Sequence, residues 1–136
     1  MSPPGARAPG EIVGIGVDLV SISRVRDLAV RFGDRFLTRI FTQDEILESR
    51  GRPVYLAGRF GVKESLLKAL GTGLSGGVKW TEIGTRSMDT GAPIVSCEGG
   101  VSRILKEKGV RDIWVSISHE RESVVSMVIL TGGSEA

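Results

Sequence analysis

The stretch VYLAGRFGVKESLLKAL, residues 54–70, determines which arrangements are open to the rest of the chain. Placed at about 100° per residue, its side chains divide between two sides of a helix. One side is apolar and consists of Leu56, Phe60, Leu67 and Leu70. The neighbouring side carries one carboxylate, Glu64, and one ammonium group, Lys68, among the small residues Ala57, Gly58, Gly61 and Ser65. The pattern predicts one long helix that Gly71 ends.

A strand is predicted at EIVGIGVDLV, residues 11–20, because its apolar residues alternate with other types. We expect its apolar face to pack against a core; that face consists of Val13, Ile15, Val17 and Leu19. The opposite face consists of Gly14, Gly16 and Asp18. Glycine weakens a strand and often marks the close approach of a ligand or of another backbone.

The remaining segments predict an α+β fold, in which a small, mostly antiparallel sheet packs with the long helix. Short helices are predicted near residues 25–32, after the capping box Thr42-Gln-Asp-Glu45, and at residues 101–108. Strands are predicted at residues 79–88 and 92–97 around the turn 89–91, and at residues 113–119 and 124–130. We expect one domain over residues 11–130, with a disordered extension at residues 1–10 and a polar tail at residues 131–136.

Composition limits the classes of protein that the chain can represent. It has 136 residues with 40% hydrophobic and 25% charged side chains, which indicates one globular domain. The net charge of +2 is too small to argue for nucleic acid, and no apolar run approaches the roughly 18 residues of a membrane span. With Cys97 as the single cysteine and no signal peptide, we expect a reducing, cytoplasmic setting. Cys97, Trp80 and Trp114 are interpreted as core residues.

Asp18, Glu64 and Lys68 are the strongest candidates for chemistry. Glu64 and Lys68 are four residues apart on the predicted helix and are therefore neighbours. Two carboxylates without nearby sulfur or additional imidazole ligands suit a hard cation such as Mg²⁺, whose remaining ligands would be phosphate oxygens and water. The alternative is an ordinary solvated ion pair, and nothing local brings Asp18 to Glu64.

Three further features each have a functional and a structural interpretation. His119, the only histidine, ends a predicted strand, where functional residues are common, but it could equally be a structural hydrogen-bonding group. The glycines around Thr72 could offer backbone N–H groups to a phosphate, or simply form a flexible loop. A row of arginines could attract an acidic partner, or form a solvated helix face; its members are Arg24, Arg26, Arg31, Arg35 and Arg39.

Several motifs occur in the order of a known family. They are GIGVD at 14–18, AGRFGVKE at 57–64, KALGTG at 68–73, GAP at 91–93 and VSISH at 115–119. On these motifs, residues 11–130 closely resemble holo-[acyl-carrier-protein] synthase, the small bacterial type of 4'-phosphopantetheinyl transferase. The resemblance implies transfer of 4'-phosphopantetheine from coenzyme A to a serine of apo acyl carrier protein, with release of adenosine 3',5'-bisphosphate and a role in fatty acid or polyketide biosynthesis.

The resemblance also implies roles for individual residues. Asp18 and Glu64 would bind Mg²⁺, Glu64 would assist removal of the serine proton, and Lys68 would stabilise the leaving phosphate. Coenzyme A would be bound by His119 from an adjacent subunit of a homotrimer, and also by Arg59, Lys63, Gly71, Thr72 and Gly73. Arg24 would contact the acidic carrier. The glycine face of the first strand and the Ala57/Gly61 side of the helix would then leave space for the long cofactor.

Two other classes of function compete with the transferase. A small magnesium-dependent hydrolase would use the same Asp18 and Glu64, but few other carboxylates occur at suitable spacing. A basic RNA-binding module would need surface aromatic side chains, and only 5% of the residues are aromatic.

Overall fold

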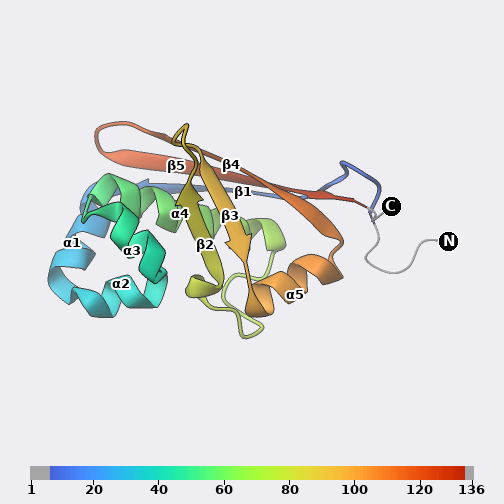
Figure 1. Cartoon of the computed structure of the whole chain (residues 1–136), viewed down its shortest axis with the longest axis horizontal. Helices are drawn as coiled ribbons and strands as arrows, with labels where there is room; N and C mark the ends of the chain where they lie inside the picture. The colour runs from blue at the N-terminus through green and yellow to red at the C-terminus, as the bar shows by residue number, and fades with distance from the viewer. Residues whose placement is uncertain (1–6, 134–136) are drawn as a thin grey trace.

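The structure is a computed structural model that describes residues 7–133. It has the expected α+β architecture (Figure 1). In chain order the elements are β1 (Ile12–Ser21), α1 (Ile22–Phe32), α2 (Asp34–Ile40), α3 (Gln43–Ser49), α4 (Pro53–Leu70), a 3₁₀ turn (Trp80–Glu82), β2 (Ile83–Ser87), β3 (Pro93–Cys97), α5 (Gly99–Glu107), β4 (Val110–His119) and β5 (Ser123–Gly132).

The strands form two antiparallel sheets. The larger sheet has the order β1-β5-β4, so β5 is central and β1 and β4 are its edges. The smaller sheet is the hairpin of β2 and β3, whose turn follows Ser87 as expected. In Figure 1 the three long strands run side by side, with α1, α2 and α3 gathered at one end of the molecule and α5 at the other. The long helix α4 packs along β1 and β5.

The glycine face of β1 contacts α4, which corrects the expectation that this face leaves room for a cofactor. A Cβ atom on Gly16 would lie 1.8 Å from the carbonyl oxygen of Ser65, and one on Gly14 would lie 2.0 Å from that of Ala69. On the helix side, a Cβ atom on Gly61 would lie 2.5 Å from Ser126 Oγ. The small residues therefore allow helix and strand backbones to touch, and this space is already filled.

The apolar face of β1, expected to meet a core, is exposed instead. Ile15 is 54% exposed and Leu19 is 71% exposed. The strand pairing continues this outer face with exposed residues of β5 and β4, namely Val125, Met127 and Trp114. Trp114 is 59% exposed, so its interpretation as a core residue was wrong; its Nε1 donates to Thr131 Oγ1 at 2.9 Å.

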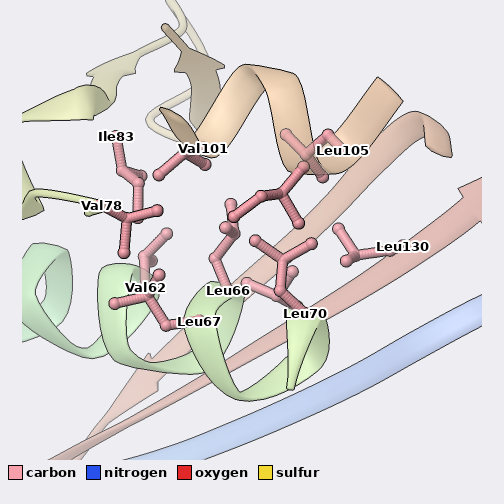
Figure 2. Packing of buried hydrophobic residues seen from close by; sticks show 11 residues of the cluster. Val62, Leu66, Leu67, Leu70, Val78, Ile83, Val101, Leu105 and Leu130 are labelled. Atoms are coloured by element: carbon pink, nitrogen blue, oxygen red, sulfur yellow. The ribbon is translucent and has the colours of Figure 1, made fainter. Parts of the chain in front are cut away.

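The main core lies on the other side of α4, between this helix, α5, β5 and the segment from Val78 to Ile83 (Figure 2). Val62 and Leu66 of α4 are fully buried there, although they lie outside the predicted apolar stripe. A second cluster joins α1, α2 and the first half of α4 around Phe41. Because α4 is covered on several sides, its burial does not follow a single amphipathic stripe. Trp80 packs against both clusters, as expected.

Local signals predicted several boundaries correctly. The capping box at the start of α3 is present: Thr42 Oγ1 accepts from the Glu45 N–H, and Glu45 Oε1 accepts from the Thr42 N–H. The strand predicted from residue 79 begins only at Ile83, because Glu82 Oε1 accepts from the Lys79 N–H and closes a 3₁₀ turn.

Cys97 is partly buried, and burial raises the pKa of its thiol to about 12.

Within residues 7–133, both tails are shorter than the sequence predicts, because residues at each end take part in the fold. Strand β5 continues to Gly132, whose carbonyl accepts from the Gly10 N–H at 2.9 Å. Arg7 Nε donates to the Lys108 carbonyl at 3.1 Å. The expectation of disorder for residues 1–6 lies outside the described residues. None of the helices within residues 7–133 combines the length and apolar character needed to cross a membrane.

Candidate functional site

Asp18, Glu64 and Lys68 meet at the edge of the large sheet formed by β1. Asp18 projects from β1 on the side that packs against α4, and its side chain is 17% exposed. Lys68 Nζ lies 2.8 Å from Asp18 Oδ1 and donates to the Val17 carbonyl at 3.1 Å. The fold therefore joins a strand carboxylate to the helix pair, which are about fifty positions apart in sequence.

The electrostatics of Glu64 show that the two carboxylates influence each other. Burial raises the pKa of Glu64 above its ordinary value, and the negative charge of Asp18 raises it further. The positive charges of Lys68 and Arg24 oppose this shift without cancelling it. For Lys68, the hydrogen bond to Asp18 is the main reason why its pKa is raised. Glu64 is thus a carboxylate that binds a proton more readily than an exposed one.

This donor set fits a divalent cation of the magnesium type. Asp18 and Glu64 supply oxygen ligands only, and a cation between them would relieve the repulsion that raises the pKa of Glu64. Across residues 7–133, no group of three or more His, Cys, Asp or Glu side chains is placed to hold a metal ion. Magnesium usually takes one or two protein carboxylates and completes its octahedron with phosphate and water.

A cavity of about 480 Å³ opens beside these side chains. Its walls come from the second half of α4, the loop after it and the 3₁₀ turn, and consist of Glu64, Leu67, Lys68, Gly71, Gly73, Leu74 and Trp80. Gly71 ends α4 with a φ of 79°, a conformation that favours glycine. Thr72 is not part of the wall; its Oγ1 donates to the Gly73 carbonyl. The two glycines, but not Thr72, are therefore brought to Glu64.

Arg24 approaches the same site from α1. Ser21 caps this helix by accepting from the Arg24 N–H at 3.3 Å, so Arg24 lies in the first turn next to the end of β1. Its positive charge acts to lower the pKa of Glu64. The other members of the arginine row are also exposed, and α1 and α2 together present a basic surface adjoining the site.

Lys63, expected to bind coenzyme A, lies in the interior. Its side chain is fully buried, with Nζ 2.7 Å from Glu45 Oε1. Lys63 also donates to the carbonyls of Trp80 at 3.2 Å and Ile83 at 2.6 Å, so its three N–H groups are all used. This expectation was therefore wrong: Lys63 joins α4 to α3 and β2. Glu64, the next residue in sequence, projects about 100° further round the helix and is partly exposed.

Arg59 and His119 line a second cavity, of about 530 Å³, which shares no wall residue with the first. Arg59 is 5% exposed, and its Nη1 is buried without a hydrogen-bond partner among the described residues. His119 ends β4, whereas Asp18 lies on β1, so the two occupy opposite edges of the sheet with β5 between them. Two strand spacings amount to about 10 Å. Within one chain, the structure does not bring His119 or Arg59 to the Asp18–Lys68 site.

Sequence reasoning missed the residues that surround these groups. Trp80 and Leu74 form apolar walls beside Glu64. Tyr55 stacks under Arg59, with 4.6 Å between the guanidinium carbon and the ring centre. The spacing of four residues between Tyr55 and Arg59 on a helix was an available signal for this last contact.

Comparisons with known proteins agree with one another. Residues 14–127 match the family model described as the 4'-phosphopantetheinyl transferase superfamily. The chain is 40% identical over 120 residues to the holo-[acyl-carrier-protein] synthase of Desulfovibrio desulfuricans, covering 88% of this chain and 97% of that protein. A crystal structure of the enzyme from Neisseria meningitidis superposes with a TM-score of 0.80 at 37% identity, covering 88% of this chain and 98% of that one. The Helicobacter pylori enzyme, crystallised in complex with coenzyme A, gives a TM-score of 0.78 at 27% identity, covering 85% and 98%.

Proposed function

This chain belongs to the 4'-phosphopantetheinyl transferase superfamily, and from that premise we propose that it transfers 4'-phosphopantetheine from coenzyme A to a serine of apo acyl carrier protein. The serine oxygen forms a bond to phosphorus, the P–O bond to the nucleotide breaks, and adenosine 3',5'-bisphosphate leaves. The observation that supports this proposal most directly is the convergence of Asp18 with Glu64 and Lys68, two residues that line one cavity.

Glu64 is suited to accept the serine proton. Before a cation binds, burial and Asp18 raise its pKa, so it takes up a proton more readily than an ordinary surface carboxylate. A placed base of this kind contributes roughly 10²–10⁴-fold to rate. Lys68 carries its charge next to the same site and can stabilise the negative charge on the departing nucleotide phosphate.

Asp18 and Glu64 would hold Mg²⁺ with the pyrophosphate of coenzyme A. When bound, the ion supplies Lewis-acid stabilisation of charge on the phosphate oxygens. In its absence, Lys68 neutralises Asp18 at 2.8 Å. Asp18 therefore has two uses for its carboxylate: it binds the cation, and it orients the ammonium group of Lys68.

Coenzyme A carries a further phosphate group besides the pyrophosphate at the metal centre. The second cavity offers basic side chains that could bind this group. Arg59 and His119 line it, and Arg59 Nη1 has no acceptor among the described residues. An arginine fork binds phosphate through paired hydrogen bonds. We assign Arg59 and His119 to the nucleotide end of coenzyme A, and the loop from Gly71 to Gly73 to the part near Glu64.

Asp18 and His119 lie on opposite edge strands of the sheet, and the two cavities share no wall residue, so one coenzyme A would reach both most simply between neighbouring copies. The exposed apolar outer face of the sheet, which includes Ile15, Leu19 and Trp114, is the kind of surface that another copy covers. We therefore propose a homotrimer, in which Arg59 and His119 of one subunit complete the site built on Glu64 of the next.

The basic surface of α1 and α2 would receive the acidic carrier. The charge of Arg24 acts on Glu64, so a carrier held at Arg24 would present its serine near the base. Electrostatic attraction would increase the rate of encounter and make it dependent on salt concentration. With its unpaired Cys97, the protein suits a reducing cytoplasm, where it would serve fatty acid or polyketide biosynthesis.

The direct experiment is to incubate the protein with coenzyme A, Mg²⁺ and apo acyl carrier protein, and to weigh the carrier by mass spectrometry. Transfer adds one 4'-phosphopantetheine to the carrier and releases adenosine 3',5'-bisphosphate. Coenzyme A cleavage with an unmodified carrier would instead indicate the hydrolase. Glu64→Gln is the matched variant, and we expect it to abolish transfer while the fold is retained.

A further inference from the structure

Glu48 lies outside the groups assigned so far, yet it connects three elements near the second cavity. Its Oε2 accepts a hydrogen bond from the Tyr55 hydroxyl of α4. Its Oε1 accepts from the Ser87 N–H at 3.0 Å, at the end of β2. Both carboxylate oxygens are therefore used, and α3, α4 and β2 are held together at this point.

The two residues that Glu48 holds are the ones that contact Arg59. Arg59 Nη2 donates to Ser87 Oγ at 2.7 Å. The guanidinium lies over the Tyr55 ring, 4.6 Å from its centre. A flat cation that is fixed by one hydrogen bond and one aromatic face has little freedom left, so its remaining donors point in a defined direction.

Arg59 nevertheless keeps binding capacity. Within residues 7–133 it forms no ion pair, although its charge acts on Glu48, whose two oxygens accept from Tyr55 and Ser87. Its Nη1 is buried and without a partner in that part of the chain. Leaving a buried donor unsatisfied destabilises the folded state, and more so when the donor is charged. Such a cost indicates a place that an external acceptor fills.

We propose that Glu48, Tyr55 and Ser87 are positioning residues that hold Arg59 ready to bind a phosphate group of coenzyme A. The proposal rests on the proposed function, because it assigns a scaffold to that substrate site. Glu48 would act by orienting Tyr55 and Ser87 while leaving the guanidinium unpaired.

The charge state of Glu48 suits this role. Burial alone would raise the pKa of Glu48, but the hydrogen bonds from Tyr55 and Ser87 outweigh it and hold the pKa below its ordinary value. Arg59, the cation that faces it, lowers the pKa further. The carboxylate is therefore ionised at neutral pH, and the scaffold stays in place over the range in which the enzyme would work.

The first test uses Ser87→Ala, which removes one contact to Arg59, and Tyr55→Phe, which keeps the ring but releases Glu48. We expect each variant to weaken the binding of adenosine 3',5'-bisphosphate, measured by isothermal titration calorimetry. The dissociation constant should rise roughly tenfold, because losing one hydrogen bond to a charged group changes it by about that factor. The KM for coenzyme A should rise by a similar factor, with kcat and the KM for the carrier unchanged. Loss of kcat and thermal stability with normal nucleotide binding would indicate a merely structural role and overturn the proposal.

Glu48→Gln tests the carboxylate itself, and Asp44→Asn is its control, because it makes the same charge change at an exposed position of α3. The first should weaken nucleotide binding and the second should leave it as in the wild type. Equal effects of the two variants would mean that only net charge matters, which would refute the positioning role.

A double-mutant cycle decides whether the scaffold acts through Arg59. In an Arg59→Lys background, Ser87→Ala should have no further effect on nucleotide binding, because the group it positions is gone. Independent, additive effects would overturn the proposal. If Arg59→Lys does not fold, Arg59→Gln serves the same cycle. Failure of the wild-type protein to modify apo carrier would instead reject the proposed function, while the binding data still judge the scaffold.

Discussion

At the residue scale, the surroundings of Glu64 raise its pKa, and the same surroundings make its charged form unfavourable for folding. Burial and the nearby Asp18 raise its pKa above the ordinary value of 4.5, so folding favours its protonated form. The stability that this proton contributes is complete below pH 4.5 and is lost as the pH rises through the higher pKa of the folded state. At neutral pH the charged side chain is therefore unfavourable, unless a cation binds beside it.

We accordingly expect Glu64→Gln to raise the melting temperature of the metal-free protein at pH 7. The difference should shrink as the pH falls through the raised pKa of Glu64 towards 4.5, and should be gone below 4.5. Added Mg²⁺ should raise the melting temperature of the wild type, because it binds only the folded state, and should have little effect on the variant. Differential scanning fluorimetry over a pH series provides the measurement. If Mg²⁺ leaves the melting temperature of the wild type unchanged, the assignment of Asp18 and Glu64 as ligands is contradicted.

At the element scale, the contact between β1 and α4 depends on the absence of side chains. Gly16→Ala places a Cβ atom 1.8 Å from the Ser65 carbonyl, and neither backbone can move without disturbing the site at Asp18. We expect a loss of about 3 kcal/mol in the free energy of unfolding, measured by urea denaturation. Gly58→Ala is the control, because its Cβ would lie 3.4 Å from Ile117 and gains helix propensity. Equal stability of the two variants would show that the close packing is not limiting.

Helix α3 presents two carboxylates to the same neighbours. Glu45 accepts from the Thr85 N–H at 3.0 Å, and Glu48 accepts from the Ser87 N–H at 3.0 Å, so together they cover one edge of β2. Glu45 also pairs with the buried Lys63. The element thereby links the small hairpin to α4.

Lys63→Met should cost about 3–5 kcal/mol, because it leaves Glu45 buried and charged without its partner. Adding Glu45→Gln to this variant removes the unpaired charge, and we expect it to recover most of the stability. In the double variant the KM for coenzyme A should stay close to the wild-type value. If stability is restored but the KM for coenzyme A rises strongly, Lys63 binds the substrate after all.

At the scale of the whole molecule, the arrangement of edges suggests that catalysis is shared between copies. Asp18 and Glu64 lie by the β1 edge, while His119 ends the β4 edge. The outer face between them carries exposed apolar residues on all three strands. Covering this face with identical copies would bury it and bring unlike edges together.

Mixing two inactive variants tests this arrangement. Glu64→Gln and His119→Ala should each be inactive or strongly impaired, yet a mixture that is allowed to exchange subunits should regain about a quarter of wild-type activity, because one interface in four then holds both intact residues. The readout is carrier modification after exchange. No recovery despite mixed trimers, observed by native mass spectrometry, would place each site within one chain.

The sequence by itself determined the elements and most of the chemical groups. The alternation of residues 11–20, the capping box at Thr42 and the helix over residues 54–70 all appear as predicted, because these signals act over a few neighbouring residues. Only the tertiary structure decided which face of β1 is buried. The same alternation fits either face, and the glycines face inward because only they allow α4 to approach.

Tertiary packing likewise decided the fate of the charged residues on α4. Lys63 and Glu64 are adjacent in sequence, yet they have different partners. Lys63 is buried in an ion pair with Glu45, while Glu64 lies close enough to Asp18 for its pKa to be raised. The partners come from α3 and β1, many positions away, so no local pattern contains them. Which charge is satisfied inside and which is left for a ligand depends on long-range contacts, and these exist only once the chain has folded.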